Sequence, residues 1–162
     1  MQPPATVSIL GVPIHNVTED EAVTYLAALL RAGGPHQVVT TNPEFVMEAQ
    51  HNAAFRAVLL KADLATPDGF GLILAARWLG TPLHGRATGV ALVQRIAALA
   101  AEQGYPKAEA AYGLMHVRGQ GVTKDYVIGV QWLRKAAEQG LAVAQTNLTP
   151  DVQPRHGCGA GF

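Results

Sequence analysis

Two short polar segments stand where apolar segments end, and they contain the residues best suited to chemistry. One is Thr40-Thr41-Asn42 and the other is Thr66-Pro67-Asp68-Gly69. Asp68 can serve as a general base, because a carboxylate held in a turn between proline and glycine is able to take a proton from a hydroxyl. The alternative is that Asp68 only caps the helix expected to follow it.

Thr40, Asn42 and Arg86 have the chemistry to hold a polar or anionic ligand. A hydroxyl and an amide at the end of a strand can hydrogen-bond a sugar or a phosphate, and a helix opened by Pro43 adds backbone N–H donors. The guanidinium of Arg86 matches the oxygens of a phosphate. The alternatives are strand termination and helix capping for the first two residues, and a solvated surface arginine for the third.

Several common kinds of site have no counterpart in this sequence. The six histidines and Cys158 show no metal-ligand spacing, so we expect no metal site. The segment Gly69-Phe70-Gly71 lacks the third glycine of a dinucleotide fingerprint, and neither a P-loop nor a G-x-S-x-G motif occurs. We therefore expect a site that works without a cofactor.

The composition is that of a globular protein, and the length fits either one domain or one small domain with an appendage. The chain has 162 residues, of which 49% are hydrophobic, and its 12 basic residues balance its 12 acidic ones. This balance argues against nucleic-acid binding, which needs a basic face. With a single cysteine, no basic leader before an apolar run and no apolar run of about 18 residues, we expect a cytoplasmic protein.

The first hundred residues alternate between strand and helix patterns, which is typical of a parallel α/β sheet. Strands are expected in 6–14, with a turn at Gly11, and at 37–40 and 64–66. Helices are expected between Thr18 and Gly33, from Pro43, from near Ala53, over 72–79 and from Thr88 or Gly89 to Gln103. Ligands bind beyond the carboxyl ends of such strands, which is where the two polar segments stand.

The last third of the chain carries a repeat. Ala-Ala-Glu-Gln-Gly occurs at 100–104 and again at 136–140, and a fixed period in the thirties indicates a helix-turn-helix unit. Helices are expected over about 108–117 and 126–139, on either side of a Gly119-Gln120-Gly121 turn. Residues 149–162 have little apolar periodicity, so we expect a flexible tail there.

The segment from Ile9 to about Gly104 resembles the TagA/WecG/CpsF family of bacterial glycosyltransferases. The matching motifs are Ile9–Ile14, Val39–Glu44, Ala62-Asp63, Thr66–Gly71, Ala75–Arg77, Leu79-Gly80 and Arg86–Gly89. The resemblance implies inverting transfer of an N-acetylmannosamine-type sugar from a UDP donor to a lipid-diphosphate-linked acceptor. It places this reaction in the biosynthesis of cell-surface polysaccharides such as teichoic acid, with a peripheral contact at the inner face of the membrane.

The same resemblance implies roles for individual residues. Asp68 and Thr40 become the catalytic residues, with Asp68 as the base, and Asn42, Arg86 and Gly69 become substrate-binding residues. The match covers only the N-terminal half of the family fold, so we expect a truncated Rossmann-like parallel sheet with flanking helices. We also expect weak or absent UDP-sugar binding. The sequence departs from the family at Ala91, where an acidic residue is usual.

From about Pro106 onward the chain resembles a Sel-like, tetratricopeptide-related repeat, in which Tyr112 and Trp132 would fill the space between two helices. We therefore predict an α/β domain over 1–104, an α-helical hairpin repeat over 105–148 and a tail over 149–162. A half-sheet leaves a strand edge uncovered, which favours a homo-oligomer. The alternative function is an inactive remnant that binds a protein partner through its repeat.

Overall fold

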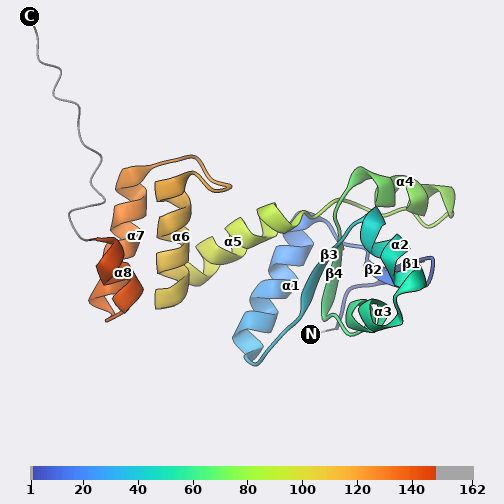
Figure 1. Ribbon diagram of the computed structural model, residues 1–162, viewed down its shortest axis with the longest axis horizontal. Helices are drawn as coiled ribbons and strands as arrows, with labels where there is room; N and C mark the ends of the chain where they lie inside the picture. The colour runs from blue at the N-terminus through green and yellow to red at the C-terminus, as the bar shows by residue number, and fades with distance from the viewer. Residues whose placement is uncertain (1, 149–162) are drawn as a thin grey trace, which may run out of the picture. The chain divides into compact units, whose positions relative to one another are not determined.

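The structure is a computed structural model that describes residues 2–148. The chain forms two compact units, one ending at Ile96 and the other beginning at Ala97, and the boundary falls inside helix α5 (Gly89–Glu102). Figure 1 follows the chain through both units, and each is described by itself below. The tail predicted over 149–162 lies outside the described residues.

The first unit opens with an antiparallel hairpin. Strands β1 (Thr6–Ile9) and β2 (Val12–His15) pair so that Ile9 faces Val12 across the turn. Gly11 adopts φ +77° in this turn, a left-handed conformation that glycine reaches without strain. The predicted two-stranded ribbon with its turn at Gly11 is confirmed.

Helix α1 (Glu19–Ala32) begins with the capping box that the sequence predicts. The amide of Glu21 donates to Thr18 Oγ1 at 3.3 Å, and the amide of Thr18 donates to Glu21 Oε2 at 2.8 Å. These two bonds satisfy N–H groups that the first turn of a helix leaves without partners. The helix ends at Gly33, which has φ +74°.

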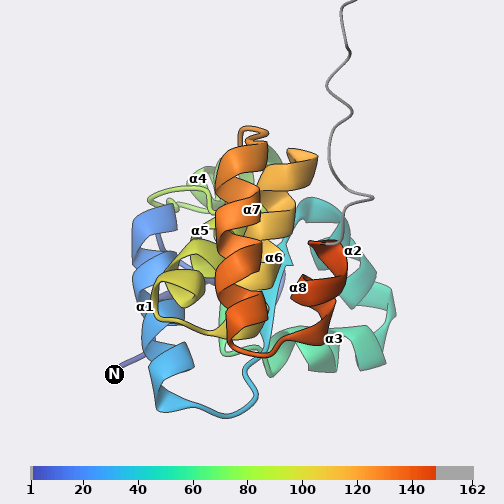
Figure 2. The same ribbon diagram turned by 90° about the vertical axis from the view of Figure 1, so that its left-hand side faces the viewer.

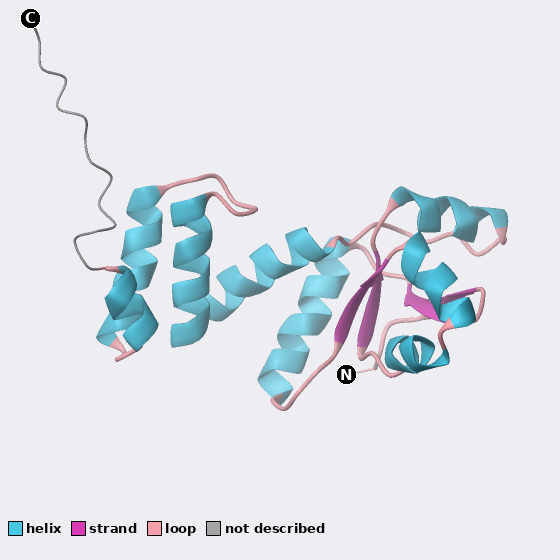
Figure 3. Cartoon of the chain, viewed as in Figure 1, coloured by secondary structure: helices cyan, strands magenta, loops and turns pink. Residues whose placement is uncertain are grey.

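A parallel pair of strands forms the centre of this unit, as Figure 3 shows in magenta. Strand β3 (Val38–Thr41) pairs with β4 (Leu64–Pro67), and Thr40 lies opposite Thr66. The remaining helices of the unit are α2 (Pro43–His51), α3 (Ala53–Leu60), α4 (Phe70–Trp78) and α5. The predicted α/β class is confirmed, although α4 begins two residues earlier than expected.

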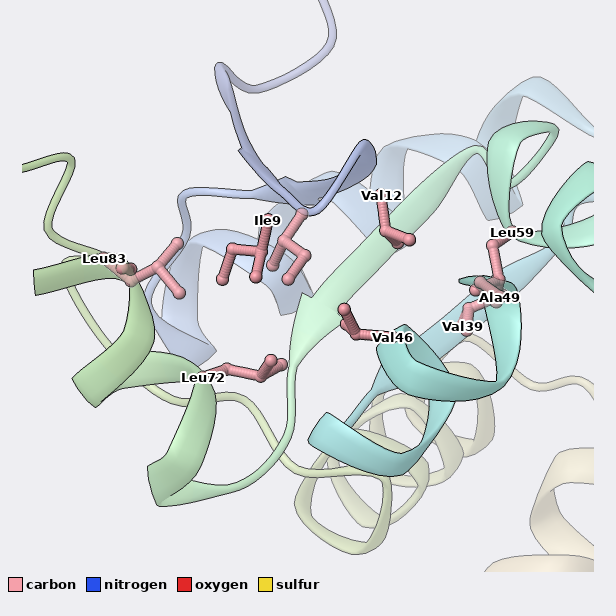
Figure 4. Close-up of a cluster of buried hydrophobic side chains, with 10 residues drawn as sticks. Ile9, Val12, Val39, Val46, Ala49, Leu59, Leu72 and Leu83 are labelled. Carbon is pink, nitrogen blue, oxygen red and sulfur yellow. The ribbon is translucent and has the colours of Figure 1, made fainter. Parts of the chain in front are cut away.

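The hydrophobic core of the unit packs against one face of the parallel pair. Its buried side chains come from the hairpin, β3, helices α2 to α4 and the loop after α4, and Figure 4 shows most of them: Ile9, Val12, Ile14, Val39, Val46, Ala49, Leu59, Leu72, Ala76 and Leu83. Because side chains alternate along a strand, Val38 and Thr40 point to the opposite face. Helices α1 and α5 flank that second face.

The outer edge of β4 is closed by groups other than a strand. The amide of Ala65 donates to His15 Nδ1 at 2.9 Å, and the amide of Ala87 donates to Pro67 O at 3.0 Å. A buried imidazole and a loop thus take the place of a neighbouring strand. The Ala65 amide and the Pro67 carbonyl at this edge of β4 therefore both have hydrogen-bond partners.

The outer edge of β3 is open. The amide of Asp68 donates to Thr41 O at 2.7 Å, so Thr41 faces β4. In a parallel pair the bonding groups alternate along each strand, and the backbone groups of Val38 and Thr40 therefore face away from β4. No backbone hydrogen bond from another element within residues 2–148 reaches them.

The second unit is helical, as the repeat predicts. Helices α6 (Pro106–Arg118), α7 (Tyr126–Glu138) and α8 (Ala142–Asn147) lie side by side in Figure 2. Gly113 and Gly129 bring α6 and α7 together, since a Cβ on either would lie 2.8 Å from the other's carbonyl oxygen. The rings of Tyr112 and Trp132 pack edge to face at 5.7 Å, which confirms their predicted place between the helices.

His15 makes the stability of the first unit depend on pH. Burial lowers the pKa of His15 below its ordinary value, and protonating Nδ1 would break its bond to Ala65. A lowered folded-state pKa gives stability that is present above the unfolded-state pKa and lost as the pH falls through the folded-state value. We expect the melting temperature to fall by several degrees between about pH 7.5 and about pH 5.5.

Circular dichroism melts across this pH range test the prediction. His15→Gln should show a smaller pH dependence, whereas His51→Gln, which alters an exposed histidine, should keep that of the wild type. A His15→Gln variant with the full wild-type dependence would contradict the prediction.

Candidate functional site

Both polar segments lie at the same edge of the parallel pair, as its strand direction requires. Thr40 is the third of the four residues of β3, and Asn42 directly follows that strand. Asp68 directly follows β4, and Gly69 joins it to α4. Figure 1 shows the carboxyl ends of β3 and β4 next to each other.

The half-buried carboxylate of Asp68 faces the start of α5. Its Oδ2 accepts a hydrogen bond from the amide of Gly89 at 3.2 Å. Helix α4, which follows Asp68 in the chain, has Gly69 at its N-cap and no side-chain capping bond. The alternative that Asp68 merely caps the following helix is therefore wrong, and within residues 2–148 its Oδ1 accepts no hydrogen bond.

Thr40 and Asp68 both contact Gly89. A Cβ added to Gly89 would lie 3.2 Å from both Oγ1 and Cγ2 of Thr40, while the amide of Gly89 bonds Asp68. The hydroxyl and the carboxylate therefore both lie at the N-terminus of α5, where the helix dipole is positive. Gly89 was not among the predicted site residues, and its signals in the sequence were its place in the Arg86–Gly89 motif and at the start of a helix.

Arg86 reaches this edge on a loop that is fixed to β4. Thr66 Oγ1 donates to Ala87 O at 3.0 Å, and the amide of Ala87 donates to Pro67 O at 3.0 Å. Arg86 precedes this anchored residue, is exposed and makes no ion pair within residues 2–148. Its guanidinium is therefore available to an anionic ligand.

Asn42 and Gly69 both have structural roles. Asn42 Oδ1 accepts a hydrogen bond from the amide of Phe45 at 2.8 Å, which confirms the capping interpretation of this residue. Gly69 adopts φ +114°, a region that side-chain-bearing residues rarely enter, and so sets the direction in which α4 leaves Asp68. Their substrate-binding roles stay predictions.

An apolar groove of about 570 Å³ adjoins the site. Its lining comes from α1, α5, β3 and the segment leading into β3, namely Leu26, Leu29, Leu30, Gly34, His36, Val38, Thr40, Gly89, Leu92, Val93 and Ile96. Arg95 connects the two helices by bonding Asp20 and, at 3.4 Å, Glu19. Thr40 and Gly89, which also form part of the site beside Asp68, are thus lining residues of the groove.

The described residues were also compared with the requirements of a metal site and of a membrane-spanning helix. Within residues 2–148, no group of three or more histidine, cysteine or acidic side chains is placed to hold a metal ion. In that same stretch, no helix is long and apolar enough to cross a bilayer.

Comparison with known proteins identifies the families to which the two parts of the sequence are similar. The glycosyl transferase WecG/TagA/CpsF family matches residues 7–112. The chain belongs to this family. The Sel1 repeat matches residues 106–141, so the WecG/TagA/CpsF segment is followed by a single helical repeat.

A curated relative matches part of the chain. It is the N-acetylglucosaminyldiphosphoundecaprenol N-acetyl-beta-D-mannosaminyltransferase of Bacillus spizizenii, with 42% identity over 52 residues. The match covers 32% of this chain and 20% of the relative. The matched segment thus spans about a fifth of the relative's length.

The contact between Gly89 and Thr40 can be tested without any ligand. In Gly89→Ala the new methyl group would sit 3.2 Å from Thr40, so that side chain has to move by a few tenths of an ångström. We expect the methyl NMR signal of Thr40 to shift, with the melting temperature changed by no more than a few degrees because alanine favours a helix. The Thr24 methyl signal, from α1, serves as the internal control, and an unmoved Thr40 signal would contradict the geometry.

Proposed function

We propose that this WecG/TagA/CpsF member transfers an N-acetylmannosamine-type sugar from a UDP donor to a lipid-diphosphate-linked acceptor. The product would serve the biosynthesis of a cell-surface polysaccharide of the teichoic-acid kind. The family match and the activity for which the Bacillus relative is named support the reaction class. The observation that carries the proposal is the meeting of Thr40 and Asp68 at Gly89, beside the anchored Arg86.

The proposed chemistry assigns one task to each side chain. Asp68 takes the proton of the acceptor hydroxyl as that oxygen attacks the anomeric carbon of the donor. The bond from this carbon to the diphosphate oxygen breaks, so the configuration inverts and UDP leaves with the bonding electron pair. Arg86 pairs with the developing charge on the diphosphate, and Thr40 hydrogen-bonds the sugar or a phosphate oxygen.

The assignment of Asp68 as the base is tested by Asp68→Asn. An asparagine oxygen can still accept the Gly89 amide bond, but the side chain cannot take a proton. We expect transfer to fall by at least about 100-fold, with little change in melting temperature. Because we expect weak donor binding, the assay uses single turnovers with excess enzyme and saturating UDP-N-acetylmannosamine.

The matched control is Glu48→Gln, which neutralises an exposed carboxylate on α2. This variant should transfer sugar at the wild-type rate. A rate retained in Asp68→Asn would remove Asp68 from the mechanism.

A second proposed role belongs to the helical unit. The Sel1 match supports a surface for a protein partner, and two neighbouring side chains at the start of α7, Val127 and Ile128, are 67% and 38% exposed. If the α/β unit lacks transferase activity, this chain acts as an interaction module through its repeat.

We also propose that two copies pair through β3. Antiparallel pairing around a two-fold axis at Val39 places Val38 of each copy opposite Thr40 of the other, so their outward N–H and C=O groups bond reciprocally. No charged side chain lies between Gln37 and Asn42, whereas free strand edges usually carry charges that prevent such pairing.

This pairing predicts a dimer that a single charge disrupts. Light scattering should give twice the 17.1 kDa chain mass for the wild type and the chain mass itself for Val38→Lys. Val58→Lys, which adds the same charge at an exposed valine on α3, should remain dimeric. A wild-type monomer at high micromolar concentration would refute the pairing.

A further inference from the structure

Helix α4 carries apolar side chains on both of its faces. Leu72 and Ala76 are 2% and 0% exposed and belong to the core. On the opposite face, Phe70, Leu74 and Trp78 follow one another at four-residue spacing and are 71%, 54% and 93% exposed. These three residues form the α4 stripe. A helix that is apolar all round is normally covered on every side.

Among aspartate, glutamate, lysine and arginine, the segment that carries the stripe and the loop after it has only arginine, and Asp68 directly precedes this segment. No aspartate or glutamate occurs from Gly69 to Thr88, whereas Arg77 and Arg86 are both exposed. The chain as a whole has no net charge. The segment around α4 is therefore a local surface that is both apolar and cationic.

This combination matches one kind of partner. Tryptophan and phenylalanine side chains settle at the boundary between lipid headgroups and acyl chains, and basic side chains beside them attract anionic headgroups. An apolar groove of another protein would cover the stripe equally well, but it would not require the absence of acidic residues over the whole segment.

We propose that the α4 stripe docks on the surface of an anionic lipid bilayer, with the helix lying in the interface. Phe70, Leu74 and Trp78 enter the headgroup–acyl boundary, and Arg77 contacts lipid phosphates. The helix remains at the surface, since its nine residues are too few to cross a bilayer.

The placement has a consequence for the site, and this part of the inference rests on the proposed function. Phe70 is the second residue after Asp68, and two residues span at most about 7 Å. Docking of α4 therefore holds Asp68 at the level of the headgroups. The diphosphate of a lipid-linked acceptor lies at that level, so the acceptor hydroxyl reaches the carboxylate without leaving the bilayer.

Vesicle co-sedimentation of the full chain tests the docking. We expect binding to phosphatidylcholine vesicles that contain phosphatidylglycerol, weaker binding to phosphatidylcholine alone, and a loss of binding at high salt. Phe70→Ser and Trp78→Ser should each reduce the partition coefficient by about tenfold. The control Val127→Ser removes an exposed apolar side chain from α7 and should bind like the wild type.

Tryptophan fluorescence supplies a second, local measurement. In Trp132→Phe only Trp78 emits, and brominated lipids in the vesicles should quench its emission. Absence of vesicle binding, or unquenched Trp78 in the bound protein, would overturn the inference. So would a dimer that Trp78→Ser converts to monomer, because the stripe would then be a protein interface.

Failure of the docking is distinguishable from failure of the proposed function. The vesicle measurements contain neither donor nor acceptor, so they report on α4 alone. Conversely, transfer to a short-chain water-soluble acceptor should proceed equally in the wild type and in Trp78→Ser. Loss of transfer with intact vesicle binding would count against the enzyme proposal only.

Discussion

The parallel pairing of β3 with β4 is the constraint on which the site depends. A parallel pair sends both carboxyl ends to one edge, and the bond from the Asp68 amide to Thr41 O extends the ladder to the residue that carries the carboxylate. Helix α5 then begins at Gly89, between Asp68 and Thr40. Because Gly89 has no side chain, Thr40 lies closer to the start of this helix than a Cβ at that position would permit without a small shift.

Local patterns in the sequence were enough to predict the helices and strands of the fold. The capping box at Thr18, the turn at Gly11 and the alternation of strand and helix all concern residues that are neighbours in the chain, and the structure has them as predicted. The position of Asp68 at the carboxyl ends of the strands could be predicted as well, since the direction of the parallel strands alone determines it. The resemblance added the family, which residues 7–112 confirm.

Contacts between residues distant in the chain could not be predicted in this way. Nothing near Asp68 in the sequence indicates that its carboxylate bonds Gly89, 21 positions later, instead of capping α4. The imidazole of His15 closing the edge of β4 is a second case, because a lone histidine in a strand pattern carries no sign of its partner. The exposure of the α4 stripe is a third feature that the sequence did not predict, because the same leucines and aromatic residues would suit a fully buried helix.

In the helical unit, Gly113 and Gly129 let two backbones touch, each occupying the volume that a methyl group would need on the other. A side chain at either position would force the two helices apart where they touch. In an array of such units, the separation within each hairpin fixes how far and at what angle the following unit is displaced. Two missing carbon atoms would therefore determine the pitch and curvature of any longer superhelix built from this repeat.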